Sequence, residues 1–532
     1  MTALPFSLFD SYQKKIITLN PKSTVIPNIL KMYSCGPTVY NYQHIGNLRA
    51  AWLADTVAST ARLLGWKVEW VMNITDVGHL VGDGDEARNV TDTADKIEQA
   101  AQKTRQSVAE IVNHYTEDYQ VQTKTLALEI PTGKHLSKAT EYIESQMLLA
   151  LNLLANGRAY LLEDGIYFDS TANEDINPFP SPTGNSNYTG REIKNTTKNP
   201  ADFALWKFVS ETSLQKWKFN QFDATASVMI QLQQANPTPE YLGLPNKWGS
   251  PGWHSECVAM ICKILNGSFP PRTENKRPVI DLHLGGEDHI DIHHKNEILQ
   301  SRASGFELSR YWVHNKFVTV DGQKMSKSKG NVYRLVGDKN SLLEHGFDPL
   351  AYRLLLFEHH YTQTLDFTWD KLQQAQARLY KLRKESAQIR SYLEGLISLN
   401  EKNQSLYQQE FVLLQDNLNT PKFLERYGSL TTEILTDALN ENFVSEHNYL
   451  KLRYFEERFL KLQLYPKIPK IISSLLRERL DAKRSKDYLK ADSIRDQLLE
   501  YGWQIDDYRG GKFQGVWLKN SGLTGLKTEI TN

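Results

Sequence analysis

Cysteine is scarce in this 532-residue chain, in which Cys35, Cys257 and Cys262 are the only thiols. So few cysteines argue against a disulfide framework and fit a reducing compartment. No apolar run approaches the roughly 18 residues that a membrane-spanning helix needs. The first residues, MTALPFSLFDSYQKK, lack the pattern of a signal peptide. The sequence therefore predicts a soluble cytoplasmic protein with no membrane partner.

Net charge is also lacking, because 62 Lys and Arg residues balance 62 Asp and Glu residues. No global field indicates a nucleic-acid partner, so any RNA contact has to come from local basic patches. Length, in contrast, is ample. A chain of 532 residues is expected to hold several domains with substantial cores.

The most informative stretch runs from residue 32 to residue 76. A short apolar run ends at Cys35, an amphipathic helix follows a loop and includes Leu48, and residues 67–75 return as a second strand. This order predicts a βαβ unit. Ligands of open α/β sheets bind at the carboxyl ends of the strands. The loop after Cys35 is therefore the first candidate for a binding site.

That loop contains the motif His44-Ile45-Gly46-Asn47. Free N–H groups and the helix dipole at the start of the helix suit a phosphate. His44 would add a hydrogen-bond donor, and Gly46 would let a nucleotide approach the backbone. Taken alone, the motif is more typical of a helix-capping loop with a surface histidine.

A second motif, KMSKS at residues 324–328, follows an expected strand over residues 311–320 and lies downstream of the HIGN motif at residues 44–47. Alone it would be a solvated basic turn. In this order the two motifs resemble the two signatures of class I aminoacyl-tRNA synthetases, and CGPTVY at residues 35–40 narrows the resemblance to cysteinyl-tRNA synthetases. Asn47 departs from the family, which usually has histidine there; asparagine can donate a hydrogen bond but carries no charge. The resemblance covers nearly the whole chain except residues 210–247, for which the sequence offers no functional account.

The resemblance implies a metal site made of Cys35, Cys257, His293 and Glu297. His293 and Glu297 are four residues apart, so on a helix they share one face and can chelate one ion. Sequence alone cannot bring the two cysteines together, and without the family a solvated helix face plus two buried cysteines would be the better interpretation. Two thiolates, an imidazole and a carboxylate favour one tetrahedral Zn²⁺. Cys262 is expected in the core, where free cysteine behaves as a small hydrophobe.

Zinc would serve substrate recognition here. Cysteine and serine differ mainly in S versus O, and a hydrophobic pocket separates such near-isosteres by only about a hundredfold. A soft metal can bind the substrate sulfur as thiolate, whereas the hydroxyl of serine is a harder and far less acidic ligand. The implied activity is ATP-dependent activation of L-cysteine to cysteinyl-adenylate, followed by transfer to the 3′ end of tRNA(Cys).

The resemblance also assigns roles to the remaining positions. The implied catalytic residues are His44, Asn47, Lys324 and Lys327, the lysines clamping the triphosphate. The implied ATP-binding residues are His44, Gly46, Asn47, Gly285, Gly286, Asp288 and Lys327. The implied amino-acid-binding residues are Gly36, Thr75 and Trp253, of which Trp253 could instead be an ordinary core aromatic. Mg²⁺ is expected to accompany ATP, held largely by phosphates and water.

The predicted fold class is α/β. It has a Rossmann-type parallel-sheet catalytic domain with an insertion, followed by an all-α bundle and a small C-terminal domain. The implied divisions are a first catalytic half (1–130), an insertion facing the tRNA acceptor end (131–205), a second catalytic half (206–330), a stem-contact region (331–370), an anticodon-binding bundle (371–466) and a C-terminal tRNA-binding domain (467–532). The protein is expected to be a monomer.

Two alternatives compete with this interpretation. One is a related ligase that transfers cysteine to an amino sugar, which would not need the helical C-terminal third. The other is a non-catalytic RNA-binding paralogue, against which the intact KMSKS motif and the four ligand-type residues argue. Cysteine-dependent ATP–pyrophosphate exchange and charging of tRNA separate the three.

Overall fold

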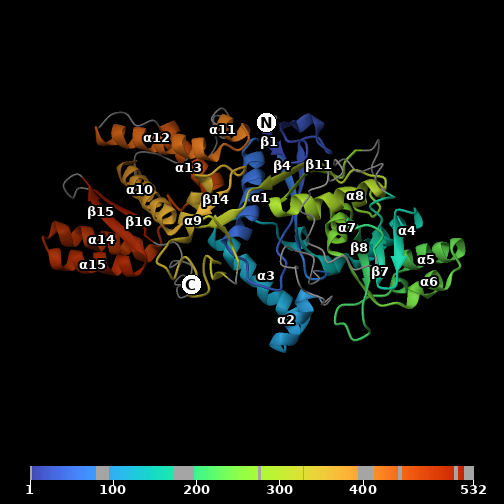
Figure 1. Ribbon diagram of the computed structural model, residues 1–532. Helices are drawn as coiled ribbons and strands as arrows, with labels where there is room; N and C mark the ends of the chain where they lie inside the picture. Colours follow the sequence, from blue (N-terminus) through green and yellow to red (C-terminus); the bar gives the residue numbers. More distant parts are fainter. Residues whose placement is uncertain are drawn as a thin grey trace.

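The computed structural model describes residues 3–78, 95–172, 197–272, 277–326, 329–393, 411–440, 446–508 and 513–519. Its centre is a five-stranded sheet with the order β11-β10-β3-β4-β5 (Figure 1). All neighbouring pairs in this sheet are parallel. Its strands are β3 (Ile29–Ser34), β4 (Lys67–Ile74), β5 (Leu136–Lys138), β10 (Ile280–Gly286) and β11 (Ser309–Asn315). The prediction of a Rossmann-type parallel sheet is confirmed.

The two faces of the sheet pack into two separate hydrophobic cores, because side chains alternate in direction along each strand. On β3, Met32 belongs to the core that contains α1 (Ile45–Leu63), while Tyr33 belongs to the core of α4 (Ile143–Ala155) and α7 (Trp253–Leu265). Both side chains are fully buried. Because successive residues of a strand point to opposite faces, helices can cover both sides of the sheet, as parallel sheets require.

The predicted βαβ unit is present as β3-α1-β4, and it is preceded by the antiparallel pair β1 (Phe6–Asp10) and β2 (Lys15–Leu19). Helices α2 (Lys96–Thr104) and α3 (Val108–Thr125) precede β5. A four-stranded antiparallel sheet, β6-β7-β8-β9, begins in the predicted insertion (131–205) and extends past its end. Its strands are β6 (Ala159–Leu162), β7 (Gly165–Phe168), β8 (Phe203–Phe208) and β9 (Gly249–Pro251).

One predicted strand was wrong. Residues 311–320 were expected to form a single strand, but β11 ends at Asn315 and β12 (Val318–Val320) belongs to another sheet, with β13 (Gln323–Lys324) and β14 (Leu365–Phe367). The interruption has a visible cause. The guanidinium of Arg49, buried on α1, donates to the carbonyls of Lys316 and Phe317, each at 2.8 Å, and this fixes the chain between the two sheets.

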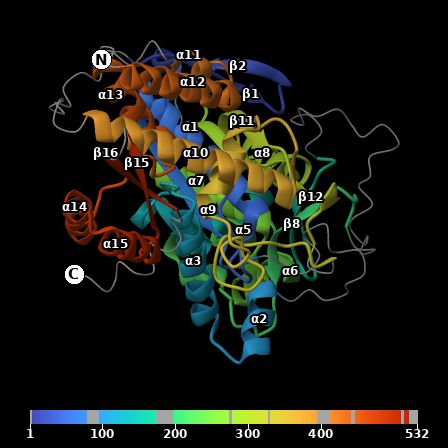
Figure 2. The ribbon, with the colours of Figure 1, turned by 90° about the vertical axis from the view of Figure 1, so that its left-hand side faces the viewer.

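The C-terminal third is helical, as its periodicity predicts. Figure 2 shows α12 and α13 above α10, and α14 and α15 below it at the left. The helices are α9 (Pro349–Phe357), α10 (Trp369–Leu393), α11 (Val412–Gln415), α12 (Thr420–Leu439) and α13 (Glu446–Phe455). A smaller unit of α14 (Lys470–Arg484), α15 (Tyr488–Glu500), β15 (Trp503–Tyr508) and β16 (Phe513–Leu518) has its own apolar cluster.

Candidate active site

The candidate site lies where the strand order of the central sheet reverses. From β3 the chain builds the sheet outward through β4 to β5, whereas β10 and β11 occupy the opposite side of β3. Cys35 follows the end of β3, and its backbone N–H donates to the carbonyl of Leu284 on β10 at 3.1 Å. Such a switch point leaves a crevice outside the carboxyl ends of the strands, which is the usual ligand site of open α/β sheets.

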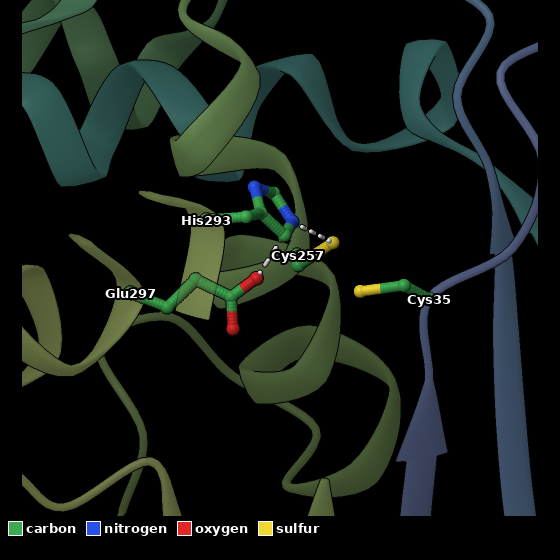
Figure 3. Close-up of side chains that lie close together, drawn as sticks. All are labelled: Cys35, Cys257, His293 and Glu297. Atoms are coloured by element: carbon green, nitrogen blue, oxygen red, sulfur yellow. Dashed lines mark hydrogen bonds and ion pairs between the residues drawn. The ribbon is translucent and has the colours of Figure 1, made fainter. Parts of the chain in front are cut away.

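Four predicted metal ligands meet in this crevice (Figure 3). The ligand atoms of Cys35, Cys257, His293 and Glu297 all lie within 4.8 Å of one another. Cys257 Sγ is 3.4 Å from Nε2 of His293, which is 2.9 Å from Oε1 of Glu297. Cys35 comes from the end of β3, Cys257 from α7, His293 from the turn Ile290–His294 and Glu297 from α8 (Lys295–Ala303). The structure therefore brings together side chains that the sequence could only list.

Burial and neighbouring groups shift the pKa of every member of this quartet. Burial raises the pKa of both thiols, that of Cys257 well above its ordinary value. Burial would lower the pKa of His293, but Glu297 and Cys257 raise it to about 10. Burial would raise the pKa of Glu297, yet His283 and His293 hold it well below its usual range. A divalent cation would stabilise the thiolate, carboxylate and neutral imidazole forms together.

Further histidines surround the quartet, and sequence reasoning did not assign them to it. His283 Nε2 lies 2.8 Å from Oε2 of Glu297, and His294 Nε2 lies 3.2 Å from Sγ of Cys35. Cys35, His283, His294 and Glu297 thus form a second group within the same 4.8 Å limit. The available signal was His283 itself, an ionisable residue in the middle of a buried strand.

Two more contacts hold the imidazole of His293. Its Nδ1 is 3.1 Å from Nδ1 of His254, and Trp253 stacks on its ring with centroids 4.4 Å apart and planes at 19°. Trp253, the first residue of α7, is half-buried. The structure places it against a candidate ligand rather than deep in the core, so its ring forms one wall of the site.

Gly36 and Thr75 lie where β3 and β4 end side by side. A Cβ on Gly36 would lie 1.8 Å from the backbone oxygen of Asn73, so only glycine allows this close approach. Asn73 also accepts a hydrogen bond from Gly36 N–H at 2.8 Å and donates to Thr75 Oγ1 at 2.9 Å. Both residues therefore lie at the carboxyl ends of these strands and hold the two chain segments together, while contact with the amino acid stays a prediction.

The HIGN motif forms the start of α1, as expected. His44 is the N-cap residue, and its Nδ1 accepts from the N–H groups of Gly46 (3.1 Å) and Asn47 (3.4 Å). Asn47 Oδ1 accepts from His44 N–H at 3.1 Å, which completes a capping box. The capping alternative is thus present in the structure. Binding of a nucleotide by the HIGN motif stays a prediction.

The second signature lies against the first. A Cβ on Gly46 would come within 2.3 Å of Cε of Met325, and the backbone N–H of Ile45 donates to the carbonyl of Tyr333 at 2.9 Å. Lys324, in β13, is exposed. Lys327 lies outside the described residues, so its predicted role is a proposal only.

The remaining predicted residues lie at the end of β10 (Gly285 and Gly286) and just after it (Asp288). A Cβ on Gly285 would meet His294 Cε1 at 2.7 Å, so the missing side chain makes room for the histidine group. Gly286 is followed by the short turn Glu287–His289, where the Asp288 side chain is about half exposed (53%). All three positions flank the crevice on the side of β10.

Comparison with known proteins defines the class. The profile of the tRNA synthetases class I (C) catalytic domain matches residues 22–81, 85–221 and 231–377. Over 515 residues the chain is 33% identical to Cysteine--tRNA ligase 1 of Burkholderia lata, covering 96% of each chain. It is 32% identical to the Cysteine--tRNA ligase of Treponema denticola, covering 90% of this chain and 94% of that one. The chain therefore belongs to the cysteine–tRNA ligase family of class I aminoacyl-tRNA synthetases, a family of enzymes.

Solved structures of other synthetases match more distantly. The methionyl-tRNA synthetase of Mycobacterium tuberculosis, in complex with methionyl-adenylate, has a TM-score of 0.47 and 16% sequence identity over 82% of this chain and 88% of that chain.

Within the described residues, no helix combines the length and apolar character needed to cross a membrane.

Proposed function

We propose that this chain activates L-cysteine with ATP and transfers the cysteinyl group to tRNA(Cys), and that it recognises cysteine through a zinc–thiolate bond. In the first step a carboxylate oxygen of cysteine bonds to the α-phosphorus of ATP while the bond to pyrophosphate breaks. In the second step the terminal ribose hydroxyl of tRNA attacks the carbonyl of the adenylate, and AMP leaves. The observation that carries the proposal is the convergence of Cys35, Cys257, His293 and Glu297 at the switch point.

The four residues fit zinc on their own chemistry. Zn–S and Zn–N bonds of about 2.3 and 2.0 Å in a tetrahedron place ligand atoms about 3.3–3.8 Å apart, within the 4.8 Å limit observed. The oxygens of Glu297 are fully buried, beside Nε2 of His293 at 2.9 Å and Nε2 of His283 at 2.8 Å. Cys35, Cys257, His293 and Glu297 supply two sulfur donors and so suit zinc better than the group with His283 and His294. Bound there, zinc would accept the thiolate of the substrate and discriminate against a hydroxyl.

The protein residues around the quartet orient it. His254 contacts the far nitrogen of His293, and His283 contacts the second oxygen of Glu297, so these two ligands are each held by a neighbour. The ring of Trp253 closes one side of the site and limits water. Positioning of this kind accounts for much of the catalysis in reactions where the protein forms no covalent bond with substrate.

The nucleotide is proposed to lie between the two signatures. Backbone N–H groups at the start of α1 would face its phosphates if His44 released them. Lys324 and Lys327 would stabilise the charge that develops on the triphosphate. Mg²⁺ would accompany ATP through phosphate and water ligands. Gly285, Gly286 and Asp288 are proposed for the remaining part of the nucleotide.

The domain roles are proposals of the same kind. Residues 1–130 and 206–330 would form the catalytic halves, and residues 131–205 would face the tRNA acceptor end, although β5 within that range pairs with β4 in the central sheet. Residues 331–370 would contact the stem. The bundle (371–466) would bind the anticodon, and the C-terminal unit (467–532) would be a further tRNA-binding domain.

Two assays test the proposal. Cysteine-dependent ATP–pyrophosphate exchange should occur with the purified protein, with serine at least a hundredfold poorer as the amino acid. Addition of tRNA should then yield cysteinyl-tRNA, whereas an amino sugar acceptor should yield no product. Absence of exchange would refute the catalytic assignment, and transfer to the amino sugar alone would refute the tRNA substrate.

A further inference from the structure

His289 lies beside the crevice, and neither the resemblance nor the proposed function gives it a role. It is the last residue of the short turn Glu287–His289 that follows β10, and it comes directly after Asp288. The side chain of His289 is 21% exposed, whereas that of the candidate ligand His293 is only 2% exposed. His289 therefore lies closer to the surface of the site than the ligand does, where a substrate can reach it.

The ring of His289 is close to the candidate metal ligands without being one of them. Its centroid is 5.3 Å from the ring centroid of His293. It is 6.2 Å from the ring centroid of Trp253, with the two planes at 74°. Neither of the two groups of ligand-type residues in the crevice includes His289. His289 and Trp253 thus both border the imidazole of His293.

The two ring nitrogens of His289 have different surroundings. Nδ1 is buried and has no hydrogen-bond partner within the described residues, and a Cβ on Gly285 would lie 2.8 Å from it. A buried N–H without a partner is rarer in proteins than a bare acceptor, so the neutral ring carries its hydrogen on Nε2. Nε2 lies 3.8 Å from Oδ2 of Asp288, which is beyond hydrogen-bond distance. The Nε2 N–H can therefore donate to a ligand.

Covalent geometry brings the carboxylate of a bound cysteine near this donor. The carboxylate carbon of cysteine is three bonds from the sulfur, so it lies about 3–4 Å from a sulfur held by the metal. His289 borders the ring of a candidate ligand of that metal, so a carboxylate at this distance can meet the Nε2 N–H. The α-ammonium group of cysteine cannot take the same place, because it offers only donors.

Building on the proposed function, we propose that the Nε2 N–H of His289 donates a hydrogen bond to the carboxylate of the cysteine substrate. The metal would hold the sulfur end of the amino acid, and His289 would hold the carboxylate end. One carboxylate oxygen accepts from His289, which leaves the other to attack the α-phosphorus of ATP. Hydrogen bonds to a charged acceptor are stronger than those between neutral groups, so this contact both binds the substrate and orients the attacking group.

The test combines changes in the protein with changes in the ligand. His289→Leu removes the donor, and His289→Gln keeps an N–H donor on a side chain of similar reach. The control is His345→Leu, at an exposed histidine that packs on Trp369. Calorimetry measures the binding of three thiols to the zinc-loaded proteins without ATP: L-cysteine, 3-mercaptopropionate, which lacks the ammonium group, and cysteamine, which lacks the carboxylate. Zinc content and thermal stability are measured for every variant.

His289→Leu should keep its zinc and weaken the binding of L-cysteine and 3-mercaptopropionate about ten- to a hundredfold, as expected for a hydrogen bond to a charged group. Cysteamine should bind as it does to the wild type, and His289→Gln should recover most of the lost affinity. An equal loss for all three thiols, a loss for cysteamine alone, or the unchanged binding expected of the control would overturn the proposal. Failure of the proposed function is read separately, as the absence of cysteine-dependent exchange in the wild type.

Discussion

Replacement of Cys257 by serine should remove zinc and cysteine activation together. Cys257 is 1% exposed, and its sulfur lies 3.4 Å from the His293 nitrogen at the centre of the quartet. Serine keeps the size and burial but is a much harder and less acidic donor, so one of two soft ligands is lost. Loss of a residue that merely supports a ligand costs ten- to a hundredfold in metal affinity. We expect loss of a ligand itself to exceed about a hundredfold, with a matching loss of exchange.

Cys262 supplies the matched control. It lies on the same helix, is fully buried, and belongs to the apolar core rather than the quartet. Cys262→Ser should cost about 1–3 kcal/mol of stability for the buried hydroxyl and leave the zinc content near one per chain. Zinc is measured by atomic emission and activation by pyrophosphate exchange. Full zinc content in Cys257→Ser, or equal loss in both variants, would refute the ligand assignment.

Three other predictions address metal, backbone and pH. Chelation should abolish cysteine-dependent exchange, and Zn²⁺ but not Mg²⁺ should restore it; exchange that survives removal of all zinc would contradict this. Gly36→Ala should destabilise the fold by at least about 2 kcal/mol in denaturant titrations, because its Cβ would overlap the backbone oxygen of Asn73; an unchanged midpoint would show that the strands can separate at no cost. Burial raises the pKa of Glu456 from 4.5 to about 7, so the native chain holds this proton more tightly than the unfolded chain. The stability it contributes is present below pH 4.5 and is lost as pH rises through 7. The Glu456→Gln variant keeps an acceptor for Leu464 N–H but cannot titrate, so its free energy of unfolding should fall less with rising pH, by up to about 3 kcal/mol. Unfolding followed by circular dichroism over a range of pH measures this difference. Identical pH profiles for the variant and the wild type would exclude the effect.

Local patterns were the reliable part of the sequence. The βαβ order around Cys35 and the four-residue spacing of His293 and Glu297 depend on short-range geometry, and the structure has both. The meeting of Cys35 with Cys257 depends on the packing of α7 against the central sheet, which no local pattern encodes. Only the family resemblance pointed to it.

The failures have equally physical causes. The strand predicted over residues 311–320 is interrupted by Arg49, a partner distant in sequence that captures two carbonyls. β5 was missed because it is only three residues long and a helical run follows it directly. The roles of His283 and His294 were missed because a buried strand and a helix start both look like ordinary core, and only the fold turns these two rings toward Glu297 and Cys35.

X-ray absorption at the zinc edge tests the central claim most directly. The purified protein should contain one zinc with two sulfur neighbours at about 2.3 Å and two nitrogen or oxygen neighbours at about 2.0–2.1 Å. Addition of L-cysteine should add sulfur to this shell, and addition of L-serine should not. A shell without sulfur, or one that cysteine leaves unchanged, would contradict the account.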